Sequence, residues 1–487
     1  MAAATSTHLM PWLVASQPLV IDFTAGCLVE DAGLLAVRHL DVSLGVLSDL
    51  AVRLPDPRSP RFIRHHAESL LVQQAYQFLA GYPDGNDADY CRNDALFQVL
   101  QGLPPDPQRP LASTSTLNRF LYGYTRRDAQ LPREERPSLL HQRRAQIQRL
   151  RTCNEFLVEL FSRTRLSPPT QIILDLDATD DPVHGHQPLS GYHGYYRQHQ
   201  YLPLLVFEGN TGFPLACWLR PGTMHAACGA VDVLRHLVER LRQAWPGVEV
   251  RVRGDNGLAV PAMMDYCEEA TLGYALGYAT NAVLERRSEH WLREVQLVHH
   301  FYGYRDPHLQ RFEQIDDYQA GSWPQPRRIV VKVEVTPAGS QRRYVVTNLP
   351  EPPGRLYQDF YVQRGWVPEQ PIGELKNGLR ADRLSCGRFC ANALKMLVAV
   401  VAYALVVLYR EACADVEGVG NADVASLRDT LWKVPAELVQ EADRVRLSLP
   451  ADWPYRQRWE QTLQAVRRHA ERLAEVGQPP GAPGQPA

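Results

Sequence analysis

Between residues 170 and 279, short apolar runs alternate with helical patterns, an order that few folds can accommodate. Three apolar runs come first, at 172–177, 201–207 and 214–219. Each is short and bounded by turn-forming residues, which is typical of strands. Two helices and two strands then alternate, at 231–241, 248–252, 259–269 and 273–279. This succession predicts a mixed α/β sheet flanked by helices.

The rest of the chain divides around this sheet. Two β runs, at 329–335 and 343–347, are separated by a proline- and glycine-containing turn, which predicts a hairpin. Helical patterns resume at about 370–380 and 388–411. We therefore predict a mainly helical N-terminal region, a first part of the α/β core, a β-rich insertion, a second part of that core, a helical C-terminal region and a disordered tail, at 1–166, 167–284, 285–350, 351–415, 416–476 and 477–487.

The composition excludes several classes of protein. Hydrophobic residues make up 45% and charged residues 22% of the 487 residues, so the chain is not disordered as a whole. A formal net charge of −2 argues against a uniformly basic DNA-coating protein. Nine cysteines without a CxxC pair predict reduced thiols, and we expect a cytoplasmic protein that has no membrane partner. The longest apolar run, 396–409, is too short to span a bilayer and predicts a buried helix.

Arginine is concentrated in one segment. Residues 119–166 hold eleven arginines and five acidic residues, whereas residues 1–100 hold eleven acids and six arginines. A helical pattern over 138–163 contains Arg143, Arg144 and Arg149. Such a charge run is compatible both with a solvated helix face and with contacts to DNA phosphates. We interpret these three arginines as candidate DNA contacts.

Acidic residues lie at the ends of predicted strands, where an α/β sheet commonly forms its functional site. Asp175 and Asp177 end the first strand and, two residues apart, project from the same face. Asp255 follows the strand at 248–252, and Glu369 precedes a helix. Taken singly, each is more simply explained as a turn or capping residue. Together, carboxylates on neighbouring strand ends and a helix could hold two Mg²⁺ ions about 3.5–4 Å apart for phosphoryl transfer.

Several motifs occur in a recognisable order. They include Asp-Leu-Asp-Ala-Thr-Asp-Asp-Pro at 175–182 and Arg-Gly-Asp-Asn-Gly at 253–257. Others lie at 201–207, 219–222, 245–246, 364–365, 374–379 and 382–385. Over about 100–410 the chain resembles the DDE transposases of bacterial insertion sequences, and among them the group called the thirteen-eighty family.

The resemblance implies an RNase H-like catalytic core with a β-rich insertion between its second and third acids. The first acid lies on the first strand, the second after the fourth strand and the third on a later helix. By motif, these acids are Asp177, Asp255 and Glu369. The resemblance implies that they are catalytic and that they ligate two Mg²⁺ or Mn²⁺ ions.

The family also carries a Tyr, Arg, Glu, Lys pattern near the third acid. It is filled here by Tyr361, Arg364, Glu369 and Lys376, with one more residue than usual between the arginine and the glutamate. Tyr361, Arg364 and Lys376 are then expected to contact DNA. Because of the extra residue, Glu374 competes with Glu369 as the third acid. Pro371 places the start of the helix near 370, and this favours Glu369.

The resemblance implies a DNA transposase that binds the inverted-repeat ends of its element and pairs them as a homodimer. It would cut the ends by metal-dependent hydrolysis and join the freed 3′ ends to target DNA. A non-cutting DNA-binding protein that keeps the fold and an RNase H-like nuclease without a joining step are the alternatives. The presence of all three acids favours cutting, and the arginine-rich segment with the long insertion favours a DNA-bridging protein. We interpret His184 and His186 as structural residues beside the bound DNA end.

Overall fold

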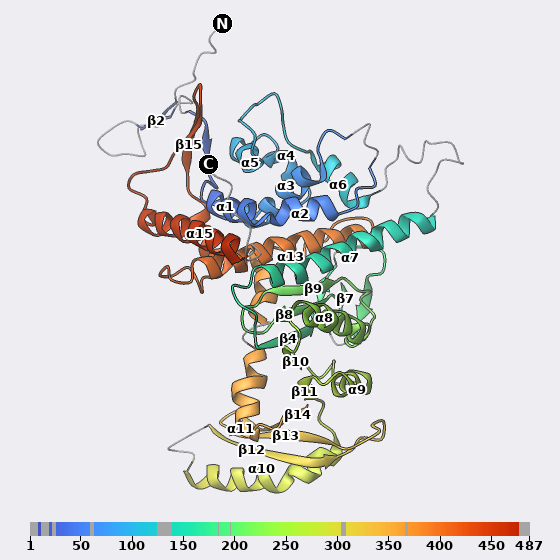
Figure 1. The fold of residues 1–487 in the computed structure, drawn as a ribbon. Coiled ribbons are helices and arrows are strands. Elements are labelled where there is room, and N and C mark those ends of the chain that lie inside the picture. Colours follow the sequence, from blue (N-terminus) through green and yellow to red (C-terminus); the bar gives the residue numbers. More distant parts are fainter. Residues whose placement is uncertain are drawn as a thin grey trace.

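The computed structural model describes residues 8–10, 19–21, 26–58, 63–123, 139–183, 185–194, 196–302, 308–365 and 369–476. In Figure 1 a layer of helices lies above a large sheet, and the sheet continues downward into strands that are covered by one long helix. The mixed α/β class predicted from the sequence is confirmed.

The central sheet has eight strands in the order β12-β13-β14-β11-β10-β4-β8-β9. The strands predicted between 170 and 279 are β4 (Gln171–Ala178), β8 (Leu204–Glu208), β9 (Pro214–Trp218), β10 (Glu249–Gly254) and β11 (Gly273–Tyr278). β10 runs parallel to β4 and to β11, whereas β8 is antiparallel to β4 and to β9. The connection from β4 to β8 forms a small separate sheet of β5 (Asp181–Pro182), β6 (Gly191–His193) and β7 (Gln198–Tyr201).

Helices cover this sheet, which explains why strands such as β8 are buried along their whole length. α8 (Ala230–Ala244) has apolar residues recurring at helical spacing, and Leu234, Leu237 and Leu241 are buried. α9 (Pro261–Glu269) begins with a proline in its first turn and packs on β11. α7 (Leu139–Arg163) and α13 (Phe389–Ala412) both pack on β9.

Residues 285–350 extend the central sheet. The predicted hairpin is β13 (Arg327–Thr336) and β14 (Gly339–Thr347), and β14 pairs antiparallel with β11. β12 (Leu309–Tyr318) forms the edge of the sheet. The long helix α10 (Ala282–Tyr302) was not expected in this segment. The segment 285–350 therefore adds three strands to the central sheet and also contributes a helix.

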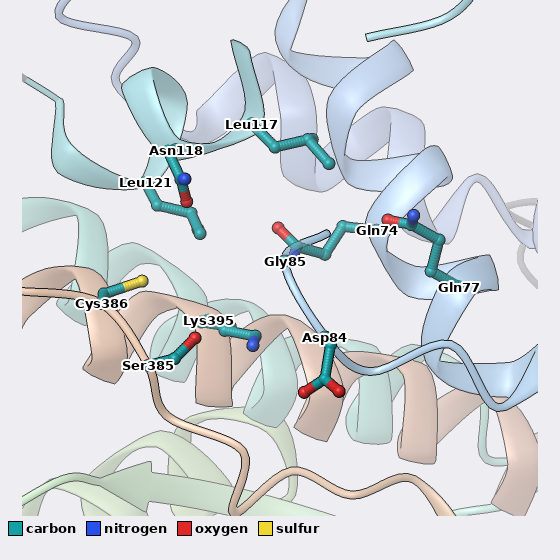
Figure 2. A pocket seen from close by; sticks show the side chains of 10 residues that line it. All are labelled: Gln74, Gln77, Asp84, Gly85, Leu117, Asn118, Leu121, Ser385, Cys386 and Lys395. Atoms are coloured by element: carbon teal, nitrogen blue, oxygen red, sulfur yellow. The ribbon is translucent and has the colours of Figure 1, made fainter. Parts of the chain in front are cut away.

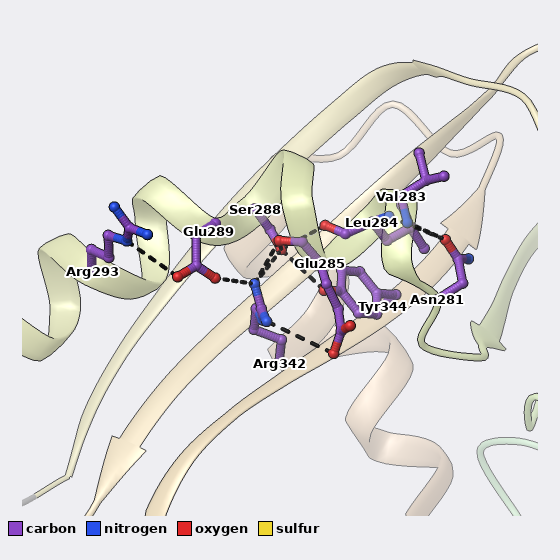
Figure 3. Close-up of polar contacts among 9 residues, drawn as sticks. All are labelled: Asn281, Val283, Leu284, Glu285, Ser288, Glu289, Arg293, Arg342 and Tyr344. Carbon is purple, nitrogen blue, oxygen red and sulfur yellow. Dashed lines mark hydrogen bonds and ion pairs between the residues drawn. The ribbon is translucent and has the colours of Figure 1, made fainter.

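α10 lies across the outer strands and is fixed by polar contacts, shown in Figure 3. Asn281 accepts hydrogen bonds from the backbone N–H groups of the first helical turn and so caps the helix. Arg342 of β14 pairs with Glu285 and Glu289, one helical turn apart. The hydroxyls of Ser288 and Tyr344 are 3.0 Å apart. These contacts orient α10 on the sheet.

α13 is the centre of the helical layer. It contacts α1 (Leu34–Leu44), α3 (Ala67–Ala80), α6 (Thr114–Tyr122), α7 and α15 (Arg456–Val476). In the part of the chain that the structure describes, it is the one helix that is long and apolar enough to cross a membrane, and its most apolar window is fully buried inside the protein. The buried helix predicted at 388–411 is confirmed. Because the N-terminal helices surround it, they share one core with the central sheet.

The C-terminal region is not wholly helical, which corrects the expectation for 416–476. After α14 (Val424–Leu427), the strands β15 (Ala436–Gln440) and β16 (Val445–Ser448) pair with each other, and β15 also pairs with β3 (Leu28–Val29). Ala436 and Leu438 are buried while Glu437 between them is exposed. This alternation, over only three residues, is the strand signal that sequence reasoning missed. The predicted tail, 477–487, lies outside the described residues.

Candidate active site

Asp177 and Asp255 end two neighbouring parallel strands. In the register of β4 and β10, Asp175 lies opposite Arg253 and Leu176 opposite Gly254. Asp177 and Asp255 are the next residues on each strand, so they emerge at the same edge of the sheet. Both are partly buried. The sheet thus brings together the first two predicted acids, although they are 78 residues apart in the chain.

The electrostatics of Asp177 show which groups surround it. Burial raises the pKa of its carboxyl from 3.8 to about 6, and the charge of Arg364 opposes that increase. Asp255 and, more weakly, Glu369 raise this pKa further, because their negative charges disfavour a negative charge on Asp177. The three predicted acids and Arg364 are therefore electrostatic neighbours.

Tyr361 and Arg364 lie near the acids at this edge of the sheet. The chain climbs from α11 (Pro353–Arg355) through two irregular helical segments, Leu356–Tyr361 and Val362–Gly365, which rise beside the sheet in Figure 1. The guanidinium carbon of Arg364 lies 6.0 Å from the centre of the Tyr361 ring. Burial lowers the pKa of Arg364, but Tyr361, Asp177 and Asp255 together raise it above its ordinary value. Nη1 of Arg364 is buried and has no hydrogen-bond partner among the residues that the structure describes.

Gly277 of β11 makes room for Tyr361. A Cβ atom at this position would lie 2.6 Å from the Tyr361 hydroxyl and 3.1 Å from the backbone nitrogen of Asn256. Any larger residue would therefore push the tyrosine or the turn after Asp255 out of place. The phenol ring of Tyr361 is seated against the same turn that carries the second acid.

Glu369 and Glu374 have different surroundings. Glu369 is exposed at the first position of α12 (Glu369–Gly373). Glu374 is buried, and its carboxylate accepts hydrogen bonds from Tyr403 at 2.7 Å and from Arg410 at 2.6 and 2.9 Å. The backbone N–H of Val424 also donates to it. The carboxylate of Glu374 thus accepts hydrogen bonds from an internal network, whereas Glu369 remains exposed.

Lys376 lies close to the end of β4. Its Nζ donates to the hydroxyl of Thr179 at 2.7 Å and to the carboxylate of Asp180 at 2.9 Å. Burial opposes ionisation of Asp180, but Lys376 lowers the pKa of this carboxyl below its ordinary value. Two of the three ammonium protons are donated in this way to described residues.

The three candidate arginines of α7 do not share one environment. Arg143 and Arg144 are exposed. Arg149 is fully buried, donates to the carbonyl of Phe120 at 2.8 Å and lies over the Phe120 ring at 4.7 Å. It therefore binds the C-terminal end of α6, where backbone carbonyls are left unpaired by the helix. The DNA contact expected of Arg149 is wrong for this structure, because its guanidinium is inaccessible.

The carboxylates of Asp177, Asp255 and Glu369 are suitable ligands for a divalent cation, but they are not arranged around one point. Carboxylates are the hard oxygen donors that Mg²⁺ and Mn²⁺ prefer, and a cation would relieve the mutual repulsion that raises the pKa of Asp177. Within the described ranges, no three His, Cys, Asp or Glu side chains lie close enough together to hold a metal ion. Of the two histidines considered in the sequence, His186 is exposed, and His184 lies outside the described residues.

Two cavities among the described residues lie away from these acids. Side chains of α3, α6 and the start of α13 converge on one of them, shown in Figure 2, which has a volume of about 10 Å³ and at most holds a single water molecule. The other, of about 660 Å³, is open and is lined by residues such as Tyr90, Asp94 and Leu438. Neither contains a predicted site residue.

Sequence reasoning missed the role of Asp175. Both of its carboxylate oxygens accept hydrogen bonds from Arg253, from Nε and Nη2, at 2.6 Å each. The carboxylate is completely buried. The sequence does contain a signal for this pair. Asp175 lies two residues before Asp177, and the oppositely charged Arg253 lies two residues before Asp255 on the neighbouring strand. Asp175 is therefore excluded from direct ligation of a cation in this arrangement.

Comparison with known proteins identifies the family of the chain. A family model described as the transposase DDE domain, group 1, matches residues 13–471. The chain belongs to this family of DDE transposases. No curated protein matches the chain significantly. Among solved structures, the chain is similar to the piggyBac transposase in a synaptic complex with hairpin DNA, at 12% identity and a TM-score of 0.41, covering 93% of this chain and 83% of that one.

Proposed function

We propose that this DDE transposase binds the inverted-repeat ends of an insertion sequence, cuts them by metal-dependent hydrolysis and joins the 3′ ends to target DNA. The observation that carries the proposal is the meeting of Asp177 and Asp255 at the ends of adjacent parallel strands, with Arg364 beside them. Membership of the DDE transposase family supports it. The catalytic core is RNase H-like in this proposal, with β4 as its first strand.

Each residue has a distinct part in the chemistry. Asp177, Asp255 and Glu369 are the residues that would hold two Mg²⁺ or Mn²⁺ ions. When bound, these ions supply Lewis-acid stabilisation of the attacking and leaving oxygens. Arg364, whose guanidinium is an electrostatic neighbour of Asp177 and Asp255, would donate to a non-bridging oxygen of the scissile phosphate. Tyr361 holds the Arg364 guanidinium in place by stacking.

Two displacements at phosphorus follow one another. In the first, a water oxygen bonds to phosphorus as the bond to the 3′ oxygen breaks, which leaves a 3′-hydroxyl and a 5′-phosphate. In the second, that 3′ oxygen bonds to a phosphorus of the target, and a target 3′ oxygen leaves with the proton. No covalent protein intermediate forms, so positioning and electrostatics supply the catalysis.

Double-stranded DNA is the partner of this reaction, both as transposon ends and as target. Arg143 and Arg144 are exposed on α7 and contact the backbone of an end, and Lys376 contacts a phosphate near β4. Two copies of the chain pair two ends as a homodimer. The protein acts in the cytoplasm, where bacterial DNA is accessible to it.

The test is a reaction of the full-length chain with DNA that carries the inverted repeats flanking its own coding sequence. Labelled end DNA, a supercoiled target plasmid and Mg²⁺ are supplied together, with the Asp177→Asn variant as control. We expect a nick or break at the repeat end and labelled DNA joined to the plasmid, both lost in the variant. Cutting without joining would instead define a nuclease, and end binding without cutting would define a non-cutting DNA-binding protein.

A further inference from the structure

The side chain of Arg253 is buried where three parts of the catalytic region meet. It forms the two hydrogen bonds with Asp175 of β4 described above. Its Nη1 donates to the carbonyl of Phe360 at 2.8 Å, in the segment that carries Tyr361. Its Nη2 also lies 3.3 Å from the carbonyl of Gly209, in the turn after β8. One guanidinium therefore connects β10 with β4, with the turn after β8 and with the Tyr361 segment.

These connections lie directly behind the proposed metal ligands. Asp175 is two residues before Asp177, and Arg253 is two residues before Asp255, on the same faces of adjacent strands. Two residues of strand span only about 6.6 Å, so a displacement at the pair is passed to both carboxylates. Gly209 leaves space for the guanidinium, because a Cβ atom there would lie 2.7 Å from Nη2.

A role in stability alone explains this pair poorly. The side chains of Arg253 and Asp175 are 2% and 0% exposed, so both charges have lost their hydration. Replacing a buried ion pair by apolar residues of similar volume is often neutral or stabilising. The two-pronged Arg–carboxylate contact does, however, fix both distance and direction between the strands.

We propose that Arg253, together with Asp175, is a positioning residue of the active site. It sets the distance between the Asp177 and Asp255 carboxylates and aligns the Tyr361–Arg364 segment with them. This inference rests on the proposed function, because it assumes that Asp177 and Asp255 hold the cation.

The decisive variant replaces both partners, Asp175→Leu with Arg253→Met, in the full chain. The pair of substitutions conserves net charge, so any change in cation affinity reports geometry and not the local field. Arg253→Lys is a second variant that keeps the charge but loses the two-pronged contact. The matched control removes an ion pair remote from the acids, Arg165→Met with Glu411→Leu, whose partners are 2.6 Å apart.

Two readouts separate positioning from folding. The first is Mn²⁺ affinity of the DNA-free chain, measured by electron paramagnetic resonance, and the second is the cleavage rate constant at saturating DNA. We expect the double variant to melt as a folded protein, to bind Mn²⁺ about 10-fold more weakly and to cut about 100-fold more slowly. Affinity for end DNA should stay within about threefold of the unmodified protein, because backbone contacts to DNA lie elsewhere.

The outcomes distinguish the two proposals. Unchanged Mn²⁺ affinity and cleavage in a folded double variant, or in Arg253→Lys if the double variant does not fold, would overturn the positioning role. An unmodified chain that cuts no DNA would instead contradict the proposed function, while the Mn²⁺ measurement still tests the pair. Control variants that lose cleavage to the same extent would show that any ion pair matters equally, which also contradicts the inference.

Discussion

Arg410 of α13 donates to both carboxylate oxygens of Glu374, at 2.6 and 2.9 Å, and Glu374 is buried directly after the helix that begins at Glu369. The contact decides between two glutamates that the sequence alone leaves in competition. A carboxylate already bound by a guanidinium, a phenol and a backbone N–H has no free geometry for a cation.

Glu374→Gln should therefore destabilise the fold, and Glu369→Gln should abolish cleavage. Removing one charge of a buried ion pair leaves the other charge without a partner, which lowers the free energy of unfolding by about 3 kcal/mol. Glu369 is exposed, so its substitution should change stability by less than about 0.5 kcal/mol. Thermal melts and a Mg²⁺ cleavage assay on both variants check this. A stable, inactive Glu374→Gln beside an active Glu369→Gln would show that the third acid is Glu374.

The arginines of α7 should separate into two kinds. Arg143→Gln and Arg144→Gln should each weaken DNA binding and reduce the slope of log affinity against log salt by about 0.9, because each removes one phosphate contact. Arg149→Gln should lower the melting temperature, since it leaves buried carbonyls of α6 without a donor, but should leave the salt slope unchanged. Salt titrations of end binding on folded protein provide the measurement. An unchanged slope in the Arg143 and Arg144 variants would place end recognition elsewhere.

Cation affinity should depend on pH through Asp177. Burial and two acidic neighbours raise the pKa of this carboxyl to about 6, and a carboxyl must lose its proton before it can bind a metal ion. Below pH 6, Mn²⁺ affinity of the DNA-free chain should fall by about tenfold per pH unit, and above pH 7 it should be constant. Asp177→Asn should remove this dependence. A flat profile from pH 5 to 8 in the unmodified chain would exclude Asp177 as the titrating ligand.

The raised pKa of Asp177 also predicts how folding stability depends on pH. A rise in pH should strengthen cation binding but lower the stability of the metal-free fold. Protonated Asp177 is favoured in the folded state, so its contribution to stability is complete below about pH 4 and is lost as pH rises through about 6. In the absence of metal, Asp177→Asn should therefore be more stable than the unmodified chain at pH 7, by at most about 3 kcal/mol. The difference should vanish near pH 4. Denaturant unfolding at both pH values tests it, and equal stability at pH 7 would contradict the burial of an ionised carboxylate.

The strands that carry the acids could be predicted from the sequence because each is a short apolar run between turns. Asp177 and Asp255 could be predicted as partners for the same reason, since parallel neighbours end at one edge. Arg149 could not be distinguished from Arg143, because its burial depends on where α6 packs against α7. α10 was missed because its apolar residues do not form one buried face: only Leu284, Ser288 and Val295 are buried. The role of Asp175 required the register of β4 against β10, which periodicity does not determine.

The most direct test of the account measures end cleavage and end binding together for Asp177→Ala and Asp255→Ala. A metal ligand serves the chemistry, whereas DNA docking depends on arginine and lysine contacts, so the two activities should separate. The account predicts that both variants bind the inverted-repeat DNA within about threefold of the unmodified chain, and that neither cuts it in Mg²⁺. Cleavage by either variant at the unmodified rate would remove that residue from the site and contradict the central claim.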